Sequence, residues 1–451
     1  MDLKDKKVLV FGSGKSGIGA ADLLGAEGAR PVIYDGNEKT DKEQVLGKTA
    51  GAYPVDFYAG ELPEEVLESL DLVVLSPGVP TDIPLVKRFY EMELPVWGEV
   101  ELAYRTGKGR VLAITGTNGK TTTTALLGKI MKDACPSVFV VGNIGTPYTS
   151  KAQEMQENSV TVVEISSFQL ETIEEFAPEV SAILNITEDH LNRHHTMEEY
   201  IRVKELITKN QSSEDVCVLN YEDEVLRKFG ETAVPKVVYF SSARTLEKGI
   251  YLEGDTIMLT TETAKIPVVK TGELKLLGQH NYENVMAAVA MAYYAGVDME
   301  SIRKSVCEFT AVEHRIEYVT EKNGVVYYND SKGTNPDAAI KGIQAMNRPT
   351  YLIGGGYDKE SSYDEWIQAF DGKVRCLVLI GQTKEKIKAA AERLGFTDIV
   401  LLENLQEAVH YCAEHAKEGE AVLLSPACAS WGQFDNYEQR GDMFKKYVSE
   451  L

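Results

Sequence analysis

Residues 110–123 carry the strongest chemical signal in the sequence, in which the apolar run RVLAIT leads into GTNGKTTT. A strand that passes through a glycine-rich turn into a helix surrounds an anion with backbone N–H groups at the helix N-terminus. Lys120 adds a positive charge, and the hydroxyl of Thr121 suits Mg²⁺. The general P-loop pattern requires glycine five residues before Gly119, where this chain has Ile114, so the segment is a variant of that pattern. It predicts a nucleotide-phosphate site.

A second glycine-rich turn lies near the N-terminus, where Gly12, Gly14 and Gly17 follow the strand-like run VLVF. Asp35 ends the next predicted strand. Its spacing in the sequence from the glycines is typical of the acidic residue that binds a ribose hydroxyl in dinucleotide-binding folds. This pattern fits a nicotinamide-dependent oxidoreductase. It also fits a UDP-sugar, because both ligands present a pyrophosphate to a helix N-terminus. Ser16 and Gly17 are candidate contacts under either interpretation.

Candidate metal ligands and catalytic groups follow the predicted strands of the middle region. Glu164 ends VTVVE, so its carboxylate is expected at the C-terminal edge of a sheet, where it could bind Mg²⁺ or cap a helix. His190 follows another strand, whereas His194 and His195 are expected to be hydrogen-bonded structural residues. Lys204 lies on a predicted helix in YIRVK and is by default a solvated surface lysine.

The segment NDSKGTNPDA, residues 329–338, joins a predicted strand to a helix that begins near Pro336. It places an acid, a base and several hydroxyl and amide groups within a few residues, and functional loops concentrate such groups. An ordinary capped turn is the alternative. The composition suits a site for a nucleotide and a small acidic substrate.

The hydrophobic pattern supplies the elements that must position these residues. The first hundred residues alternate apolar strands with helices, and a second block of nearly all-apolar strands begins near Glu99. YLEGDTIMLT near residue 250 predicts a hairpin with Gly254 and Asp255 at its turn, and a long helix is expected from Asn281 to about residue 295. A third block of alternating strands and helices starts near Glu313.

At 451 residues the chain is too long for one hydrophobic core. We therefore predict an α/β protein of three domains, comprising residues 1–98, 99–310 and 311–451. The N-terminal and C-terminal domains are expected to be Rossmann-like. The central domain is expected to be a P-loop-type mononucleotide-binding domain with a small antiparallel edge.

Composition excludes several classes of protein. The formal charge of −22 argues against nucleic acid as a partner, because neutralising phosphates requires a basic face. The six cysteines show no CxxC or CxxH spacing, which argues against a structural zinc site and a disulfide framework. No apolar run approaches the length of a membrane span, and the N-terminus lacks a secretory cleavage site. We expect a cytoplasmic protein.

Nine motifs resemble, in order along the chain, those of the Mur ligase family: GTNGKTT, GNIG, EISSFQL, the DH of TEDHLNRH, YIRVK, GQHNYENV, EHRIE, NDSKGTN and SPACASWGQFDNYEQRG. The resemblance covers essentially the whole chain. It implies one α/β domain for a UDP-sugar, one for ATP and one for an incoming amino acid. The implied reaction is ATP-dependent amide-bond formation through an acyl phosphate in peptidoglycan precursor synthesis, by a monomer.

The C-terminal motif and the lack of a DNPR-type sequence favour D-glutamate as the amino acid and UDP-N-acetylmuramoyl-L-alanine as its acceptor. A family member that adds another amino acid is the nearest alternative. An oxidoreductase would leave GTNGKTT unused, and a non-catalytic nucleotide-binding regulator would bind ATP without turnover. Three positions depart from the family pattern: Gly333 where alanine is usual, Tyr437 where phenylalanine is common, and Trp431 with Gly432 where Leu-Asp is frequent.

The resemblance also implies roles for individual residues. The catalytic residues would be Lys120, Lys204, His190 and Lys332. The ATP contacts would be Gly116, Thr117, Asn118, Gly119, Lys120, Thr121, Thr122, Asn281, Asn284, Arg315 and Asp330. The contacts to the UDP-substrate would be Ser16, Gly17, Asp35, Ser76, Gly78, Asn143 and His190. The contacts to D-glutamate would be Thr334, Lys359, Ser430 and Tyr437.

The implied cofactors are ATP, two Mg²⁺ ions and a carbamate that CO₂ forms on Lys204. The family resemblance gives the magnesium ligands as Thr121, Glu164, His190 and the carbamylated Lys204. Carbamylation requires a neutral amine, and therefore a lysine whose pKa is lowered by its surroundings.

Overall fold

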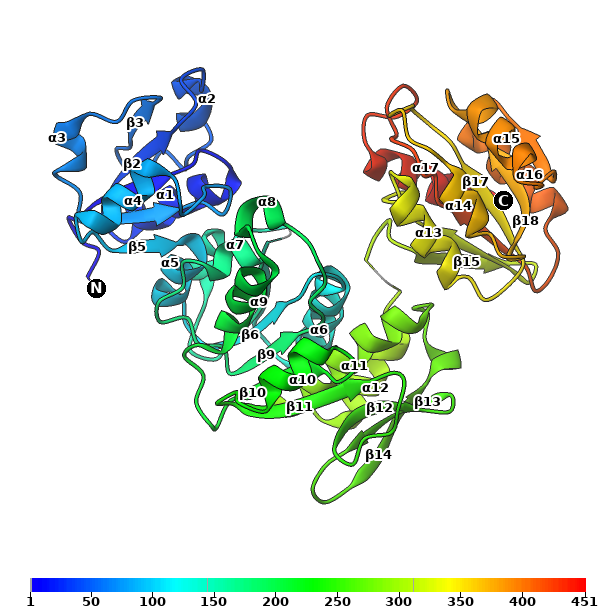
Figure 1. The fold of residues 1–451 in the computed structure, drawn as a ribbon, viewed down its shortest axis with the longest axis horizontal. Coiled ribbons are helices and arrows are strands. Elements are labelled where there is room, and N and C mark those ends of the chain that lie inside the picture. The colour runs from blue at the N-terminus through cyan, green and yellow to red at the C-terminus, as the bar shows by residue number, and fades with distance from the viewer. Residues whose placement is uncertain (1, 144, 311) are drawn as a thin grey trace. The chain divides into compact units, whose positions relative to one another are not determined.

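The computed structural model describes residues 2–143, 145–310 and 312–451, so the predicted domain starts at Met1 and Ala311 lie outside the described residues. The chain packs as two compact units, one formed by residues 1–268 and 284–305 and the other by residues 269–283 and 306–451. The first unit contains one sheet and most of a second, and the other unit contains the third sheet (Figure 1). These sheets and their helices confirm the predicted three-domain α/β class.

The first sheet has five parallel strands in the order β3-β2-β1-β4-β5, and its strand order reverses between β1 and β4. Ligands of doubly wound sheets bind at such a reversal, at the carboxyl ends of the strands. The strands are β1 (Lys7–Phe11), β2 (Arg30–Asp35), β3 (Asp56–Ala59), β4 (Leu72–Leu75) and β5 (Val96–Gly98). The helices are α1 (Lys15–Ala26), α2 (Lys42–Leu46), α3 (Glu64–Leu67) and α4 (Pro84–Glu91).

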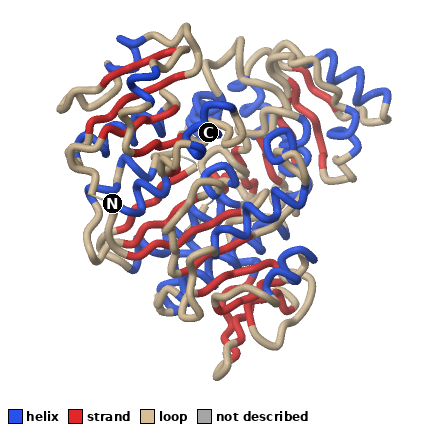
Figure 2. The backbone as a smooth tube through the Cα atoms, turned by 60° about the vertical axis from the view of Figure 1, so that its left-hand side comes forward, coloured by secondary structure: helices blue, strands red, loops and turns tan. Residues whose placement is uncertain are grey.

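The second sheet has nine strands in the order β14-β13-β12-β11-β10-β9-β6-β8-β7. The strands of the described residues are drawn red in Figure 2. The strands are β6 (Arg110–Thr115), β7 (Val138–Gly142), β8 (Val160–Glu164), β9 (Val180–Ile183), β10 (Val216–Asn220), β11 (Lys236–Ser241), β12 (Gly249–Glu253), β13 (Thr256–Thr260) and β14 (Lys265–Lys270). Strands β7 to β12 pair in parallel, whereas β12 and β13 form an antiparallel hairpin in which Glu253 pairs with Thr256. The predicted turn at Gly254 and Asp255 is therefore confirmed.

The helices that accompany the second sheet include α6, which starts at the predicted phosphate loop. They are α5 (Glu99–Thr106), α6 (Lys120–Ala134), α7 (Ser167–Leu170), α8 (Leu191–His194), α9 (Met197–Glu205), α10 (Glu224–Gly230), α11 (Gln279–Tyr294) and α12 (Met299–Glu308). Short 3₁₀ helices lie at Tyr148–Ser150, Ala152–Glu154, Leu206–Thr208 and Thr271–Glu273.

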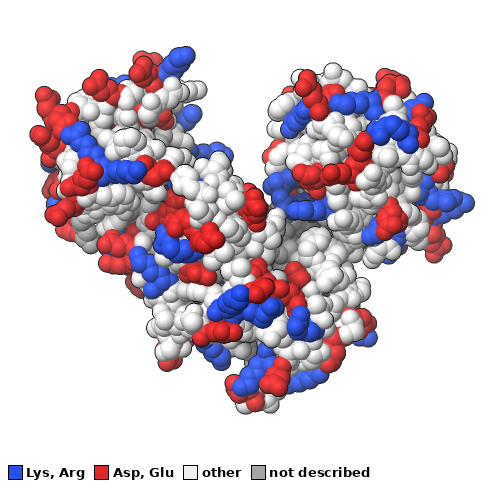
Figure 3. All heavy atoms as spheres, in the orientation of Figure 1, with Lys and Arg blue, Asp and Glu red and all other residues white. Residues whose placement is uncertain are grey.

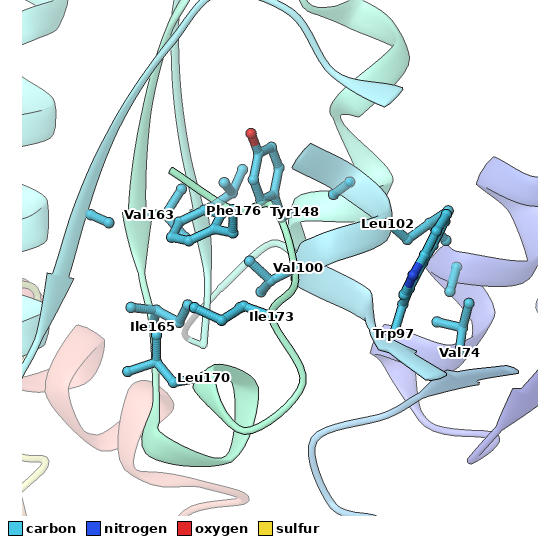
Figure 4. Packing of buried hydrophobic residues seen from close by; sticks show 14 of the residues in the cluster. Val74, Trp97, Val100, Leu102, Tyr148, Val163, Ile165, Leu170, Ile173 and Phe176 are labelled. Carbon is cyan, nitrogen blue, oxygen red and sulfur yellow. The ribbon is translucent and has the colours of Figure 1, made fainter. Parts of the chain in front are cut away.

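Helix α5 joins the first two sheets into one hydrophobic core. Val100 and Leu102 of this helix lie between Trp97 of β5 on one side and the β8 strand with Ile173 on the other (Figure 4). All of these side chains are buried in a single cluster. The carboxyl ends of β4 and β8 are therefore held in a fixed relation.

The third sheet has six strands in the order β15-β16-β20-β17-β18-β19, all parallel except β15. The strands are β15 (Glu317–Lys322), β16 (Val325–Asn329), β17 (Thr350–Gly354), β18 (Val374–Leu379), β19 (Ile399–Leu401) and β20 (Ala421–Leu424). The helices are α13 (Pro336–Ala345), α14 (Asp364–Gln368), α15 (Lys384–Arg393), α16 (Leu405–His415) and α17 (Tyr437–Ser449). Hydrophobic clusters cover both faces, as expected for a parallel sheet with apolar strands.

Three further features concern the charged surface, the helices and the cysteines. Asp and Glu side chains are interspersed with Lys and Arg on the face drawn in Figure 3. Across the described residues, none of the helices combines the length and the apolar character needed to cross a bilayer. All six cysteines are free thiols, four of them buried.

Candidate active site

The phosphate loop lies at a reversal of strand order, because β6 is placed between β8 and β9. Gly119 precedes α6 with a φ of 86°, in the left-handed region, and a Cβ there would lie 2.3 Å from Oδ1 of Asn284. Asn185, just after β9, holds the loop: its backbone oxygen accepts from Thr117 N (2.9 Å) and its Oδ1 from Asn118 N (2.8 Å). The loop is thus pinned at the carboxyl edge of the sheet.

Lys120 and Lys204 converge on this loop. Lys120 Nζ donates to the carbonyl oxygens of Gly116 and Thr117, both at 2.9 Å, and Lys204 Nζ donates to the same Gly116 oxygen at 2.8 Å. Lys204 is only 2% exposed, so its default assignment as a solvated surface lysine is wrong. Helix α9 buries this side chain because it packs on the loop through Tyr200, whose ring lies 4.7 Å from Lys204 Nζ.

The ionisation of Lys204 is strongly perturbed. Burial and the neighbouring charge of Lys120 lower its pKa to about 7, although Asp189 acts in the opposite direction. A buried amine with this pKa is neutral in a large fraction of molecules near neutral pH. This is the protonation state that reaction with CO₂ requires.

Glu164 provides an oxygen ligand at the same edge. Its Oε1 accepts from Asn143 Nδ2 at 3.0 Å, while its buried Oε2 has no hydrogen-bond partner among the described residues. Ser166 caps helix α7, so the alternative role of Glu164 as a helix cap is wrong. An ionised oxygen that is buried without a partner is costly, and a divalent cation would offset that cost. The residues at this position therefore fit a magnesium ion.

The histidines divide as follows. His190 is exposed and lies in the left-handed backbone region, with its ring 4.9 Å from that of Phe168. His194 is buried, its Nε2 lies 2.9 Å from Ser167 Oγ, and burial lowers its pKa. His195 contacts Asp82 at 3.1 Å. His194 and His195 are therefore the hydrogen-bonded structural residues that the sequence predicted.

The predicted UDP-substrate residues of the first sheet gather at its reversal point. Ser76 follows β4, and its Oγ donates to the carbonyl oxygen of Gly12 at 3.4 Å. Asp35 ends β2 and accepts hydrogen bonds from the backbone N and hydroxyl of Ser13. Burial raises the pKa of Asp35, but these and other hydrogen bonds outweigh it and lower the pKa below its ordinary value. Ser16 and Gly17 lie on the first turn of α1, and Gly78 is exposed after β4.

A cavity lies between the carboxyl ends of β4 and β5 and helix α7. Ser76, Phe168, Gln169 and Arg193 are among its lining residues. Glu99, also in the lining, is 1% exposed. Its Oε1 accepts from Gln169 Nε2 at 2.7 Å, and within the part of the chain that the structure describes its Oε2 has no hydrogen-bond partner. Burial raises the pKa of Glu99 to about 7. Glu99 was not among the residues predicted from the sequence, although it starts helix α5 directly after strand β5.

The other unit places its predicted residues after β16, β17 and β20, which are neighbours in the third sheet. Asp330 follows β16, and Ser425 Oγ donates to its Oδ2 at 2.7 Å. Burial raises the pKa of Asp330 to about 7. A Cβ on Gly333 would lie 2.8 Å from that same oxygen, which gives a physical reason for glycine where the family usually has alanine. The backbone N of Arg315 donates to residue 312 at 3.0 Å.

Two lysines at this edge lie over aromatic rings. Lys332 Nζ is 5.6 Å from the centre of the Tyr437 ring, and Lys359 Nζ is 5.1 Å from that of Trp431. Ser430 is buried beside Trp431. Cations at these distances interact favourably with a ring face.

Arg440 is a buried residue that the sequence analysis did not single out. Its guanidinium donates to Ser331 Oγ (2.9 Å), to Ser331 O (2.8 Å) and to Cys428 O (3.1 Å). Burial lowers its pKa to about 10. Arg440 therefore ties the loop after β16 to the loop after β20. The QRG sequence of the last motif contains Arg440 and could have identified it as a candidate.

The structure brings the predicted residues together within each unit. In the first unit, strands β6, β7, β8 and β9 are followed or flanked by residues 116–122, Asn143, Glu164, His190, Lys204 and Asn284. The other unit contains Asn281, Arg315, Asp330, Lys332, Thr334, Lys359, Ser430 and Tyr437. Within that unit Asn281 Nδ2 donates to Leu277 O at 2.7 Å, and Thr334 N donates to Lys332 O at 2.8 Å.

Comparison with protein-family models gives three matches along the chain. Residues 6–98 match the Mur ligase MurD-like N-terminal domain, residues 114–292 the Mur ligase middle domain, and residues 314–428 the Mur ligase glutamate ligase domain. Together these matches cover most of the chain.

Two curated relatives are similar over the full length. The UDP-N-acetylmuramoylalanine–D-glutamate ligase of Lachnoclostridium phytofermentans is 58% identical, with 100% of this chain and 99% of the relative covered. The ligase of the same name from Lachnospira eligens is 54% identical, with 100% of both chains covered. Among solved structures, the MurF ligase of Thermotoga maritima in complex with ADP has a TM-score of 0.55 at 17% identity and covers 100% of this chain and 99% of its own. That last likeness concerns the fold.

Proposed function

Because this chain belongs to the Mur ligase family, we propose that it is an ATP-dependent ligase that joins D-glutamate to UDP-N-acetylmuramoyl-L-alanine in peptidoglycan synthesis. The observation that carries the proposal is the full-length match to relatives of that name at 58% and 54% identity. We assign residues 1–98 to the UDP-substrate, 99–310 to ATP and 311–451 to the amino acid.

In the first step, a carboxylate oxygen of the alanyl end attacks the γ-phosphorus of ATP, and ADP leaves. The loop at residues 116–119 would bind the phosphates through backbone N–H groups, with Thr121 and Thr122 on the first turn of α6. Lys120 would exchange its present carbonyl partners for phosphate oxygens and stabilise the charge of the transferring group. We propose that the adenosine part of ATP is bound by Asn281, Asn284, Arg315 and Asp330.

We propose that Thr121, Glu164, His190 and Lys204 hold two Mg²⁺ ions. Bound magnesium would neutralise phosphate charge and orient the phosphoryl group for transfer. The unpartnered Oε2 of Glu164 supports its role as a ligand. For Lys204, the support is the low pKa, because the neutral amine can add CO₂ and become a carbamate with oxygen donors.

In the second step, the amine of D-glutamate attacks the acyl carbon, and phosphate leaves as the amide forms. A dianionic amino acid needs cationic partners, and Lys359 is proposed for its side-chain carboxylate. Thr334, Ser430 and Tyr437 complete this site in the proposal, and Lys332 lies over the ring of Tyr437. We propose that the UDP-substrate is bound by Ser16, Gly17, Asp35, Ser76, Gly78, Asn143 and His190.

The test is phosphate release from ATP with Mg²⁺ and UDP-N-acetylmuramoyl-L-alanine. We expect release with D-glutamate and none with L-glutamate, L-lysine, L-alanine or diaminopimelate. Phosphate release only with another amino acid would support the ligase reaction but show that D-glutamate is not the substrate. ATP binding without release would indicate a regulator, and nicotinamide binding to the turn at residues 12–17 would support an oxidoreductase. We also propose a cytoplasmic monomer, which sedimentation of the purified protein and cell fractionation would check.

A further inference from the structure

Trp431 and Tyr357 form an exposed aromatic pair at the carboxyl edge of the third sheet. Trp431 is 54% exposed and Tyr357 is 41% exposed, and their ring centres lie 5.6 Å apart in an edge-to-face arrangement. Tyr357 N also donates to Ala429 O at 2.9 Å, which joins the loop after β17 to the loop after β20. Large exposed aromatic side chains that contact each other in loops are typical of binding surfaces.

Lys359 extends from the first of these loops over the Trp431 ring, at 5.1 Å from its centre. The neighbouring carboxylate, Asp358, is occupied by Lys386 Nζ at 3.0 Å from both of its oxygens. Within the described residues, the ammonium group of Lys359 contacts the Trp431 ring and forms no ion pair. The loop therefore orders a positive charge without neutralising it.

An aromatic face differs from a carboxylate as a partner for a lysine. A carboxylate would compete with an anionic ligand, whereas the ring attracts the ammonium by about 0.5–1 kcal/mol at an exposed site and leaves its hydrogen-bond donors available. A free lysine side chain has many rotamers, and part of this rotamer entropy is lost when it binds a ligand. Ordering the chain beforehand reduces that loss on binding.

We propose that Trp431 is a positioning residue that holds Lys359 for the side-chain carboxylate of the amino-acid substrate. This inference rests on the proposed function, because it presumes that a dicarboxylic amino acid binds at this edge. The edge-to-face contact with Tyr357 fixes the ring, and the hydrogen bond between Tyr357 and Ala429 fixes both loops.

The test compares Trp431→Leu and Trp431→Phe with the wild-type chain in the phosphate-release assay. Leucine keeps apolar bulk without a ring, so we expect the KM for D-glutamate to rise about two- to five-fold, as expected from an exposed cation–π contact. Phenylalanine keeps a ring and should restore most of the affinity. The kcat and the KM values for ATP and the UDP-substrate should be unchanged, because a remote contact contributes equally to ground and transition states. Tyr90→Leu, at another exposed aromatic residue, is the matched surface control.

A double-mutant cycle with Lys359→Ala separates this role from direct contact with the substrate. If Trp431 acts through Lys359, Trp431→Leu should cause no further rise in KM once Lys359 is alanine. An equal rise in both backgrounds would overturn the proposal, as would an unchanged KM in Trp431→Leu alone. Failure of the wild-type chain to turn over D-glutamate would refute the proposed function, and this inference would fall with it.

Discussion

Replacing Lys204 by methionine should stabilise the ligand-free protein, and the gain should depend on pH. The pKa of Lys204 falls from the ordinary lysine value of 10.5 to about 7 on folding, chiefly because the side chain is buried. Below pH 7 the folded chain therefore holds a charge that costs about 5 kcal/mol. Between pH 7 and 10.5 the unfolded chain binds the proton and the folded chain does not. Over that range the free energy of unfolding should rise by about 1.4 kcal/mol per pH unit from this group alone.

Methionine keeps the long apolar stem and carries no charge. The substitution also removes the hydrogen bond from Lys204 Nζ to Gly116 O, which contributes about 1.5–3 kcal/mol. The variant should consequently be more stable than the wild type by about 2–3 kcal/mol at pH 6. At pH 9, where the cost of the charge has fallen to about 2 kcal/mol, the difference should be close to zero.

The assay is urea unfolding of both proteins from pH 6 to pH 9 in CO₂-free buffers, since carbamylation would change the group that titrates. Taking the difference between variant and wild type cancels the titration of all other residues. Lys209→Met is the control, because Lys209 also donates to a backbone carbonyl, Ile173 O, but its side chain is exposed. A difference that does not vary with pH, or a variant that is less stable at pH 6, would show that the buried charge of Lys204 does not destabilise the folded protein.

Three further predictions concern other buried groups. Burial raises the pKa of Glu99 from 4.5 to about 7, so the free energy of unfolding should fall as the pH rises from 4.5 to 7. Glu99→Gln should remove a destabilisation of about 3 kcal/mol at pH 8 and have a small effect at pH 4.5, as measured by thermal unfolding. Arg440→Lys cannot reach both Ser331 and Cys428 with one ammonium group and should lose about 2–3 kcal/mol; an unchanged urea midpoint would contradict this. Glu164→Gln should reduce phosphate release more than about 100-fold, with thermal stability retained because no described residue forms a hydrogen bond with Oε2; activity that recovers at moderate Mg²⁺ would count against its role as a ligand.

Local chemistry made several features predictable from the sequence. The strand, turn and helix around Gly119 follow from the left-handed backbone that only glycine adopts readily, and the hairpin at Gly254 and Asp255 follows from its turn residues. Strands β10 and β11 could not be predicted individually, because periodicity does not distinguish short apolar runs such as VCVLN from buried helix segments. Strand β15 could not be predicted from its apolar pattern, because its EYVTEK sequence is polar and lies at an edge of the sheet.

The environment of each side chain depended on tertiary contacts. Nothing in YIRVK indicates that Lys204 is buried; its burial results from α9 packing on the loop after β6, 88 residues earlier in the sequence. The same holds for Glu99, which meets Gln169 across 70 residues, and for Arg440, which meets Ser331 across 109. The residue types at the ends of the strands can be predicted from the sequence, because periodicity and turn chemistry are local. Which of these groups are buried and which form hydrogen bonds with one another depends on tertiary contacts, because pKa values and buried hydrogen bonds depend on neighbours distant in the chain.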